Sequence, residues 1–333
     1  MMTAFAGFSK LDREQRIKYI VENSQLKETE GLHFNDFCSR GETGQKVFED
    51  MIENYIGNFP LPLGVVANML INDETLTVPF VTEESSVVAA ASKAAKYWSS
   101  RGGFKAVVRS MTKKGQVHFT WDGSQERISE LFPEIRKRML HATDDLTEKM
   151  RQRGGGVTGI ELIDRTMDLP DYYQIDASFE TADAMGANFI NSCLETFASV
   201  LTNISELKAD GHHVEVVMSI LSNYSPDCIV NCFVECPADQ LTDWSSKLSG
   251  KGFAAKFRQA VDIANLDLNR AVTHNKGIFN GIDAVLHATG NDWRATAAAA
   301  HAYASRNGSY RGLTSISLTD NIFRYELEIP LSV

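Results

Sequence analysis

The chain has 333 residues, enough for two domains, and its hydrophobic and charged fractions of 43% and 23% are ordinary for a globular protein. Its formal net charge of −10 argues against non-specific nucleic-acid binding and docking on anionic membranes, although a few local cations would still hold an anionic ligand. Apolar runs are too short for a signal peptide or membrane span, and the 5 cysteines lack a disulfide framework, so we expect a cytoplasmic protein.

Hydrophobic periodicity predicts both helices and strands along the chain. The expected helices are residues 9–30, 45–56, 87–98, 124–153 with an interruption near Pro133, 183–207, a helical region from about 241, and 293–305. The expected strands are residues 69–81 with a turn at Asn72 and Asp73, 104–108, 115–121, 160–163, 172–179, 214–221, 228–236 and 325–333. We expect 104–108 to pair with 115–121, and Thr82 to cap the helix at residue 87.

The middle of the chain has a different character from its flanks. Residues 109–222 combine strands with two helices, whereas both flanks are more helical. The sequence therefore predicts an α+β protein with a helix-rich large domain, residues 1–108 and 223–333. A small α+β domain, residues 109–222, is inserted into it.

Residues 273–281 and 288–294 carry the polar groups with the clearest chemical potential. Lys276 and Asp292 lie here with asparagine amides and glycines around a short apolar run, residues 282–286. We expect that run to be a strand or the buried side of a helix, with the polar groups at its ends. A lysine beside a carboxylate can stabilise negative charge developing on a carbonyl oxygen, and a structural ion pair is the alternative.

Two adjacent carboxylates, Glu83 and Glu84, lie between a predicted strand and a predicted helix. Neighbouring side chains diverge, so only one of them can point into a given cleft. A partly buried glutamate can hold a proton for delivery, and simple helix N-terminal charge is the alternative.

Small residues at 183–188 form the first turn of an expected helix, where backbone N–H groups could meet a phosphate. Asp183 as N-cap is the alternative. Residues 154–159 match G-x-G-x-x-G, but a helix precedes them and a strand follows, so we expect a loop rather than a Rossmann fingerprint.

Evenly spaced Cys228, Cys232 and Cys236 fall on one face of a strand, which indicates that they line a core and do not form a metal site.

Seven short pieces of the sequence, taken in order, resemble class II 3-hydroxy-3-methylglutaryl-coenzyme A (HMG-CoA) reductases of bacteria. They are residues 53–57, 78–84, 154–156, 183–188, 222–224, 273–281 and 290–295. The resemblance implies reduction of HMG-CoA to mevalonate and coenzyme A by two hydrides from NADH or NADPH, through a hemithioacetal and an aldehyde. It also implies that the small domain is a ferredoxin-like, non-Rossmann dinucleotide-binding domain, and that the protein is a homodimer or higher homo-oligomer with residues 53–57 at the dimer contact.

The resemblance also assigns roles to single residues. Lys276 would stabilise the oxyanion, Glu84 would donate protons, and Asp292 would orient Lys276. The substrate-binding positions implied are Ser86, Arg270 and Asn280. The cofactor-binding positions implied are Asp183, Ala184, Met185, Gly186, Ala187, Asn188, Asn223 and Thr147.

Two departures from the family pattern affect the expected activity. Asp144 and Asp145 lie close to Thr147, where an acid would accept a ribose hydroxyl and repel a 2′-phosphate, so they favour NADH. The family's C-terminal flap carries a histidine that protonates the leaving thiolate, but this sequence stops before such a flap and none of its 8 histidines has the matching context. We therefore expect this chain to turn over slowly or not at all.

Two other functions remain open. A non-catalytic paralogue or fragment could bind acyl-coenzyme A without redox chemistry. A hydrolase or acyl transferase would need an activated serine or cysteine beside a base, and no such partner is visible for Cys228, Cys232 or Cys236.

Overall fold

The structure is a computed structural model that describes residues 8–23, 42–242 and 248–333. Contacts within the chain divide it into two units, Met1–Pro62 and Leu63–Val333. Among the described residues, no helix is both long and apolar enough to cross a bilayer.

The first unit holds a short 3₁₀ turn, η1 (Phe8–Lys10), and two helices, α1 (Arg13–Asn23) and α2 (Glu42–Glu49). Helix α2 ends at Glu49, before the expected end at residue 56, and the left-handed backbone at Asn54 (φ 54°) lies in the turn that follows. The segment that follows is held by α1, where Arg13 Nε donates to Ile56 O (3.2 Å) and Arg16 donates to Tyr55 O (3.1 Å). The predicted helix at 9–30 is confirmed for residues 13–23, residues 9–12 form a 3₁₀ turn and its exit, and residues 24–30 lie outside the described part of the chain.

The second unit begins with an antiparallel hairpin of β1 (Leu63–Ile71) and β2 (Glu74–Val81). Its turn residues Asn72 and Asp73 have φ of 48° and 69°, which confirms the predicted turn. Helix α3 (Val87–Ser99) follows as expected, but Thr82 does not cap it. The helix starts from Ser86, which has a left-handed backbone (φ 74°) and makes no side-chain cap bond.

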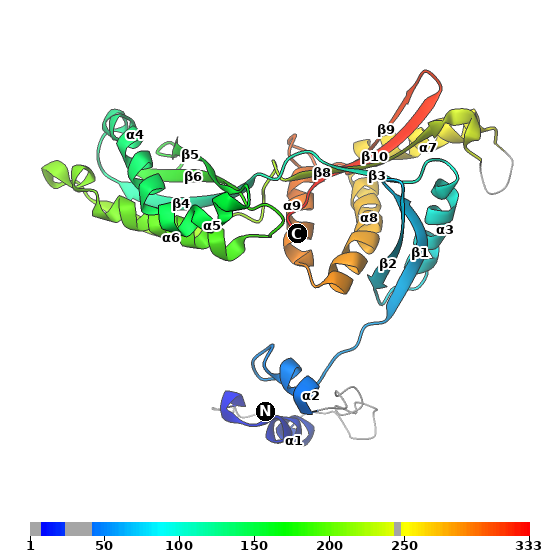
Figure 1. The fold of residues 1–333 in the computed structure, drawn as a ribbon, viewed down its shortest axis with the longest axis horizontal. Coiled ribbons are helices and arrows are strands. Elements are labelled where there is room, and N and C mark those ends of the chain that lie inside the picture. The colour runs from blue at the N-terminus through cyan, green and yellow to red at the C-terminus, as the bar shows by residue number, and fades with distance from the viewer. Residues whose placement is uncertain (1–7, 24–41, 243–247) are drawn as a thin grey trace. The chain divides into compact units, whose positions relative to one another are not determined.

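A four-stranded antiparallel sheet forms next to this hairpin, in the order β3-β8-β10-β9. Its strands are β3 (Lys105–Val108), β8 (Ile229–Pro237), β9 (Thr314–Thr319) and β10 (Ile322–Pro330). Helices α7 (Gly250–Leu266), α8 (Leu268–Thr289) and α9 (Trp293–Ala304) pack with it (Figure 1). The cores between them contain Val234, Phe323 and Ala254 in one cluster and Ile329, Phe279 and Ala300 in another.

A second four-stranded antiparallel sheet has the order β5-β6-β4-β7. Its strands are β4 (Lys113–Trp121), β5 (Gly156–Asp164), β6 (Tyr172–Glu180) and β7 (Val214–Leu221). Helices α4 (Gln125–Ala142), α5 (Asp144–Gln152) and α6 (Ala187–Asn203) accompany it, mainly green in Figure 1. The inward side chains of β4, such as Phe119, pack with Ile128 of α4 and Phe197 of α6. This antiparallel βαββαβ unit is not a Rossmann sheet, and the predicted α+β fold class is confirmed; the boundaries at 108/109 and 222/223 stay a prediction.

Two sequence predictions, one about strand pairing and one about a helix interruption, were wrong. Strand β3 does not pair with β4, because its register partner is β8, with Ala106 opposite Cys232. Pro133 lies inside α4, and the break comes at Thr143 instead. The apolar run at 282–286 is part of the 22-residue helix α8 and includes the buried Ala284 and Leu286, so the buried-helix alternative is confirmed. The polar residues around the run therefore project along one helix.

Candidate active site

Lys276 and Glu84 meet in the structure. Lys276 lies on α8, and Glu84 lies in the turn between β2 and α3. The Lys276 Nζ atom is 2.5 Å from Glu84 Oε2, and Asn280 Nδ2 is 3.5 Å from the other carboxylate oxygen, Oε1. Because residues four apart share one side of a helix, α8 presents an ammonium group and an amide to the same carboxylate.

The turn that carries Glu84 has its own supports. The Thr82 hydroxyl oxygen accepts a hydrogen bond from the Glu84 backbone N–H (3.1 Å), and the left-handed Ser86 follows two residues later. Below this turn, Phe80 and Val87 pack in the same buried cluster as Ala284 of α8. The cluster therefore fixes the strand, the turn and the helix against each other while the reactive groups stay accessible, with Lys276 and Glu84 side chains 59% and 45% exposed.

Asp292 is the N-cap of α9. Its Oδ1 accepts a hydrogen bond from Ala295 N–H (3.0 Å), and Arg294 Nε lies 3.9 Å from the same oxygen. These contacts give it a structural task, and its orientation of Lys276 stays a prediction. Arg270 stands exposed in the first turn of α8, where its backbone N–H is capped by Asp267, so its substrate contact also stays a prediction.

Residues 183–186 form a turn before α6. Asp183 is not the N-cap, because the helix starts after Gly186, whose φ of 78° is left-handed and which makes no side-chain cap bond. The Asp183 carboxylate instead pairs with Arg153 at 2.5 Å, which holds the pKa of Asp183 below its usual range. The first N–H groups of α6 therefore have no side-chain acceptor from this cap, which is an arrangement that suits a phosphate.

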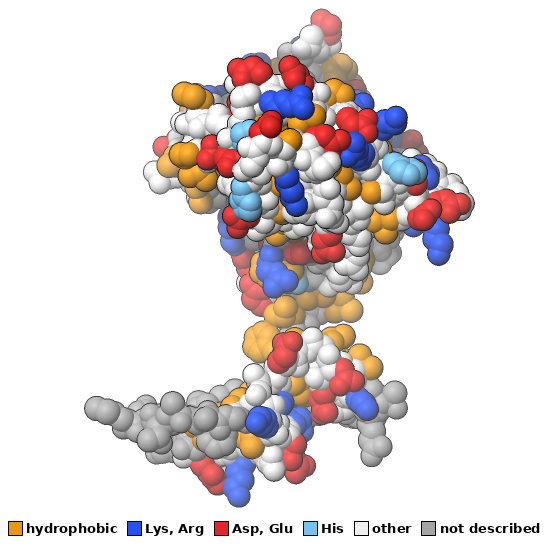
Figure 2. All heavy atoms as spheres, turned by 90° about the vertical axis from the view of Figure 1, so that its left-hand side faces the viewer, with side chains coloured by type: hydrophobic (Ala, Val, Ile, Leu, Met, Phe, Trp, Pro, Cys, Tyr) orange, Lys and Arg blue, Asp and Glu red, His pale blue; other side chains and the backbone are white. Residues whose placement is uncertain are grey.

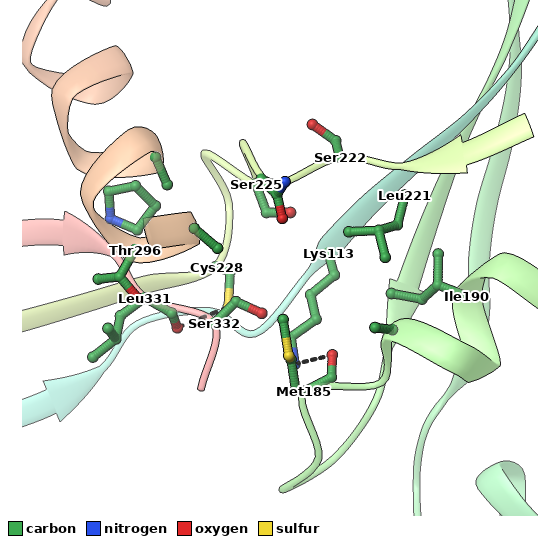
Figure 3. A pocket seen from close by; sticks show the side chains of 15 residues that line it. Lys113, Met185, Ile190, Leu221, Ser222, Ser225, Cys228, Thr296, Leu331 and Ser332 are labelled. Carbon is green, nitrogen blue, oxygen red and sulfur yellow. Dashed lines mark hydrogen bonds between the residues drawn. The ribbon is translucent and has the colours of Figure 1, made fainter. Parts of the chain in front are cut away.

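One pocket collects several of the predicted cofactor residues. Met185 and Ala187 line it from the α6 side together with Asn223, which follows β7. Thr296 of α9 and Ser332 at the end of the chain line the same pocket (Figure 3). The pocket thus joins the 183–188 segment to the first turn of the helix that Asp292 caps. Ala184 lies next to it in the same turn, and Asn188 is exposed at the start of α6.

Thr147 and Asp144 are engaged within α5. The Thr147 side chain is in a residue only 3% exposed, and its hydroxyl donates to Thr143 O (2.8 Å). Asp144 accepts hydrogen bonds from Arg151 and from His141, which together lower the pKa of its carboxyl group. A ribose contact at these positions stays a prediction.

Sequence reasoning missed Lys113, a lysine only 5% exposed that lines the same pocket. The sequence pattern of β4 could have identified this lysine. Every second residue of the strand faces inward, and Lys113 shares that inward register with Gly115, Val117 and Phe119. A charged residue in an inward register needs polar partners, so it marks a special environment.

The cysteines and His274 have structural positions. Burial raises the pKa of the Cys228, Cys232 and Cys236 thiols, which makes them poor nucleophiles. Among the described residues, no cluster of histidine, cysteine and acidic side chains could hold a metal ion. His274 contacts Thr314 Oγ1 at 2.6 Å, away from the Lys276 pair.

Comparisons with known proteins point to one family. The family model for hydroxymethylglutaryl-coenzyme A reductase matches residues 12–333. The probable 3-hydroxy-3-methylglutaryl-coenzyme A reductase of Borreliella burgdorferi is 32% identical over 100% of this chain and 74% of its own length. The enzyme of that name from Archaeoglobus fulgidus is also 32% identical, over 100% of this chain and 72% of its own length.

Solved structures agree with the sequence relatives. A class II 3-hydroxy-3-methylglutaryl-CoA reductase from Streptococcus pneumoniae, bound to NADPH in open conformations, superposes with a TM-score of 0.73 at 38% identity. That match covers 86% of this chain and 68% of the other. A second structure of the S. pneumoniae enzyme has a TM-score of 0.74 at 35% identity, over 99% of this chain and 76% of its own.

Proposed function

Because the chain belongs to the hydroxymethylglutaryl-coenzyme A reductase family, we propose that it converts HMG-CoA to mevalonate and free coenzyme A at the Lys276–Glu84 site. The reaction consumes two reduced nicotinamide dinucleotides and two protons, and it turns a thioester into a primary alcohol and a thiol. The observation that carries the proposal is the contact of Lys276 with Glu84, with Asn280 beside them.

Lys276 supplies the positive charge in this account. When a carbonyl carbon gains a hydride, its oxygen becomes negative, and a nearby ammonium group stabilises that charge. The same group serves both reductions, because the thioester and the aldehyde each develop an oxyanion. Asn280 adds an amide donor from the next turn of α8.

Glu84 supplies the proton that completes the alcohol, and the departing coenzyme A thiolate takes the second proton from solvent. A carboxylic acid within hydrogen-bond reach of the developing oxyanion can complete the alcohol and then be recharged from solvent. Its accessible side chain suits recharging, and its contact with Lys276 allows proton exchange between the two groups. Asp292 would orient the lysine, while Ser86 and Arg270 would hold the hydroxymethylglutaryl carboxylate or the coenzyme A moiety.

We infer that the residues around the pocket beside α6 contribute to a dinucleotide site. The uncapped start of α6 offers N–H donors to a pyrophosphate, and Met185, Ile190 and Leu221 offer apolar surface for a flat ring. A bound nicotinamide dinucleotide supplies the hydride. The chain contributes Asp183, Ala184, Met185, Gly186, Ala187, Asn188 and Asn223 to its binding in this proposal.

The preference between NADPH and NADH depends on the negative charge near the 2′ position of the bound ribose. The NADPH-bound S. pneumoniae structure supports a phosphorylated dinucleotide as one candidate. The ion pairs of Asp144 with Arg151 and of Asp183 with Arg153 reduce the negative charge that would repel a 2′-phosphate. We therefore propose that both dinucleotides bind.

We also propose that the chain forms a homodimer that uses residues 53–57 at its contact. On one face of the unit Leu63–Val333, basic and acidic side chains are interspersed instead of forming a basic patch (Figure 2).

One assay separates reductase, binding module and hydrolase. Purified chain is mixed with HMG-CoA and NADPH or NADH while dinucleotide absorbance and free thiol are followed together. The reductase oxidises two dinucleotides for each thiol released. Binding without either change supports an acyl-coenzyme A-binding module, and thiol release without oxidation supports a hydrolase.

The aldehyde mevaldehyde, offered with NADPH, provides the matching half-reaction. Its reduction needs one hydride and no departing thiolate, so it tests the Lys276 site independently of thiolate protonation. A chain that reduces neither the thioester nor the aldehyde is not a reductase.

A further inference from the structure

We propose that Lys113 is a positioning residue for the dinucleotide, which holds the turn at 183–186 in the shape that presents its N–H groups to the pyrophosphate. The inference rests on the proposed function, because it assumes that this turn binds the cofactor. Lys113 lies at the first position of β4, outside the Lys276–Glu84 site.

The geometry of Lys113 leaves none of its protons without an acceptor. Its Nζ donates to Thr181 Oγ1 (2.8 Å), Ala184 O (2.6 Å) and Met185 O (3.0 Å). An ammonium group has three protons, so these acceptors use all of them. The Thr181 hydroxyl also donates to Ala184 O at 2.5 Å, which closes a small network around one buried cation.

The two carbonyl groups that accept hydrogen bonds from Lys113 determine where the neighbouring N–H groups point. In a trans peptide the C=O and N–H bonds of one unit are antiparallel, and the structure has no cis peptide in its described part. Because the Ala184 and Met185 carbonyls face Lys113, the N–H groups of Met185 and Gly186 face away from it. They lie on the same segment as the uncapped N–H groups of α6, so the lysine organises one series of donors.

The backbone at Gly186 packs closely against the Thr181 side chain. A Cβ atom at this position would lie 2.4 Å from the Thr181 side chain, and the residue has a left-handed backbone. The turn therefore sits directly on the threonine that shares the Lys113 network. Figure 3 shows Lys113 reaching toward the Met185 segment, with Cys228 and Ser332 on the other side of the pocket.

The charge of Lys113 matters because a neutral amine has only two protons to donate. Burial lowers the pKa of Lys113, while the neighbouring Cys228 and Glu180 raise it. Glu180 lies at the end of β6, and its buried Oε1 has no hydrogen-bond partner among the described residues. The Arg153–Asp183 ion pair is the other charged group on the turn. Deprotonation at alkaline pH would release one acceptor and loosen the turn.

The chain offers a matched control in Lys114. It is the next residue of β4, so its side chain points to the opposite face of the sheet, where it pairs with Asp176 at 2.7 Å. We compare Lys113→Met, Lys114→Met and the unchanged chain by titration with NADPH and with NADH, read out as nicotinamide fluorescence. Lys113→Met should weaken both dinucleotides by about tenfold or more, the usual size of a lost charged hydrogen bond, and Lys114→Met should change them by less than about twofold.

Rescue and pH dependence distinguish positioning from general damage. Lys113→Arg keeps the charge and several donors, so it should recover part of the affinity. The dissociation constant of the unchanged chain should rise as the pH becomes alkaline, and that rise should be absent in Lys113→Met. In the aldehyde assay, the KM for NADPH should rise much more than kcat falls.

Thr181→Val provides a second route if Lys113→Met does not fold. It removes the shared hydroxyl while keeping the side-chain shape, and it should also weaken NADPH without unfolding the protein. Equal NADPH affinity in Lys113→Met, or in Thr181→Val, and in the unchanged chain overturns the positioning role and leaves the reductase proposal standing. Failure of the unchanged chain to bind either dinucleotide overturns both.

Discussion

The Nζ atom of Lys276 lies 2.5 Å from Glu84 Oε2, although 192 positions separate the two residues in the chain. This contact joins the long helix α8 to the turn between β2 and α3. It places a cation and a proton donor within reach of one carbonyl oxygen. The chemistry proposed for the protein depends on this pairing, and each partner can be tested separately.

Replacing Lys276 by methionine should lower kcat/KM for NADPH-dependent mevaldehyde reduction by at least about 100-fold, because the oxyanion loses its cation. The side chain is exposed, so the fold should survive. Lys256→Met on α7, also exposed, is the control for losing a surface lysine. Comparable losses in both variants would remove Lys276 from the mechanism.

Glu84→Gln should lower kcat for the same reaction by about 100-fold or more, because an amide cannot deliver the proton. The adjacent Glu83→Gln changes charge by the same amount at the next position, and it should retain most of the activity. Initial rates over a range of pH give the comparison. An equal loss in the two variants would point to general electrostatics instead of proton transfer.

Asp292 has two tasks in the account, and two substitutions separate them. Asp292→Asn keeps a cap acceptor for the Ala295 N–H but removes the charge, whereas Asp292→Ala removes both. The alanine variant should lose about 1 kcal/mol of stability in urea unfolding, and the asparagine variant much less. If Asp292 orients Lys276, both variants lose activity; full activity in Asp292→Asn would limit the residue to capping α9.

His274 should make the protein less stable in mild acid. Burial, followed by the nearby Arg270, lowers the pKa of His274 in the folded state. The unfolded chain therefore binds the proton more readily, and stability is lost as the pH falls from about 6.5 through the folded pKa. Urea unfolding at several pH values should show a shallower acid loss in His274→Gln, which keeps a partner for Thr314. The exposed His213→Gln is the matched control, and an unchanged slope in His274→Gln contradicts the assignment.

Local pattern predicted the elements well where one face is buried. The hairpin at Asn72–Asp73 and the alternating strands β6 and β7 followed from turn residues and period-two burial. Pairing was harder, because β3 and β4 are close in sequence but belong to different sheets. The run at 282–286 was ambiguous because a short apolar segment fits a strand or a buried helix side equally.

The helix starts failed for a different reason. Ser86 and Gly186 precede α3 and α6 with left-handed backbones and no side-chain cap. The predicted cap Thr82 was therefore wrong, and so was the alternative that Asp183 caps α6. The candidate site shows the same limit. Lys276 and Glu84 were each identifiable, whereas their contact, and the burial of Lys113 beneath the turn, require the assembled fold.

The most direct test follows labelled hydrogen into the product. The chain is incubated with HMG-CoA and with NADPH in which both hydrogens on C4 of the nicotinamide are deuterium, and mevalonate is analysed by mass spectrometry. We predict two deuterium atoms on the carbon that was the thioester carbonyl, and none above background with Lys276→Met. Unlabelled mevalonate, or free hydroxymethylglutarate with coenzyme A and intact NADPH, would contradict the account.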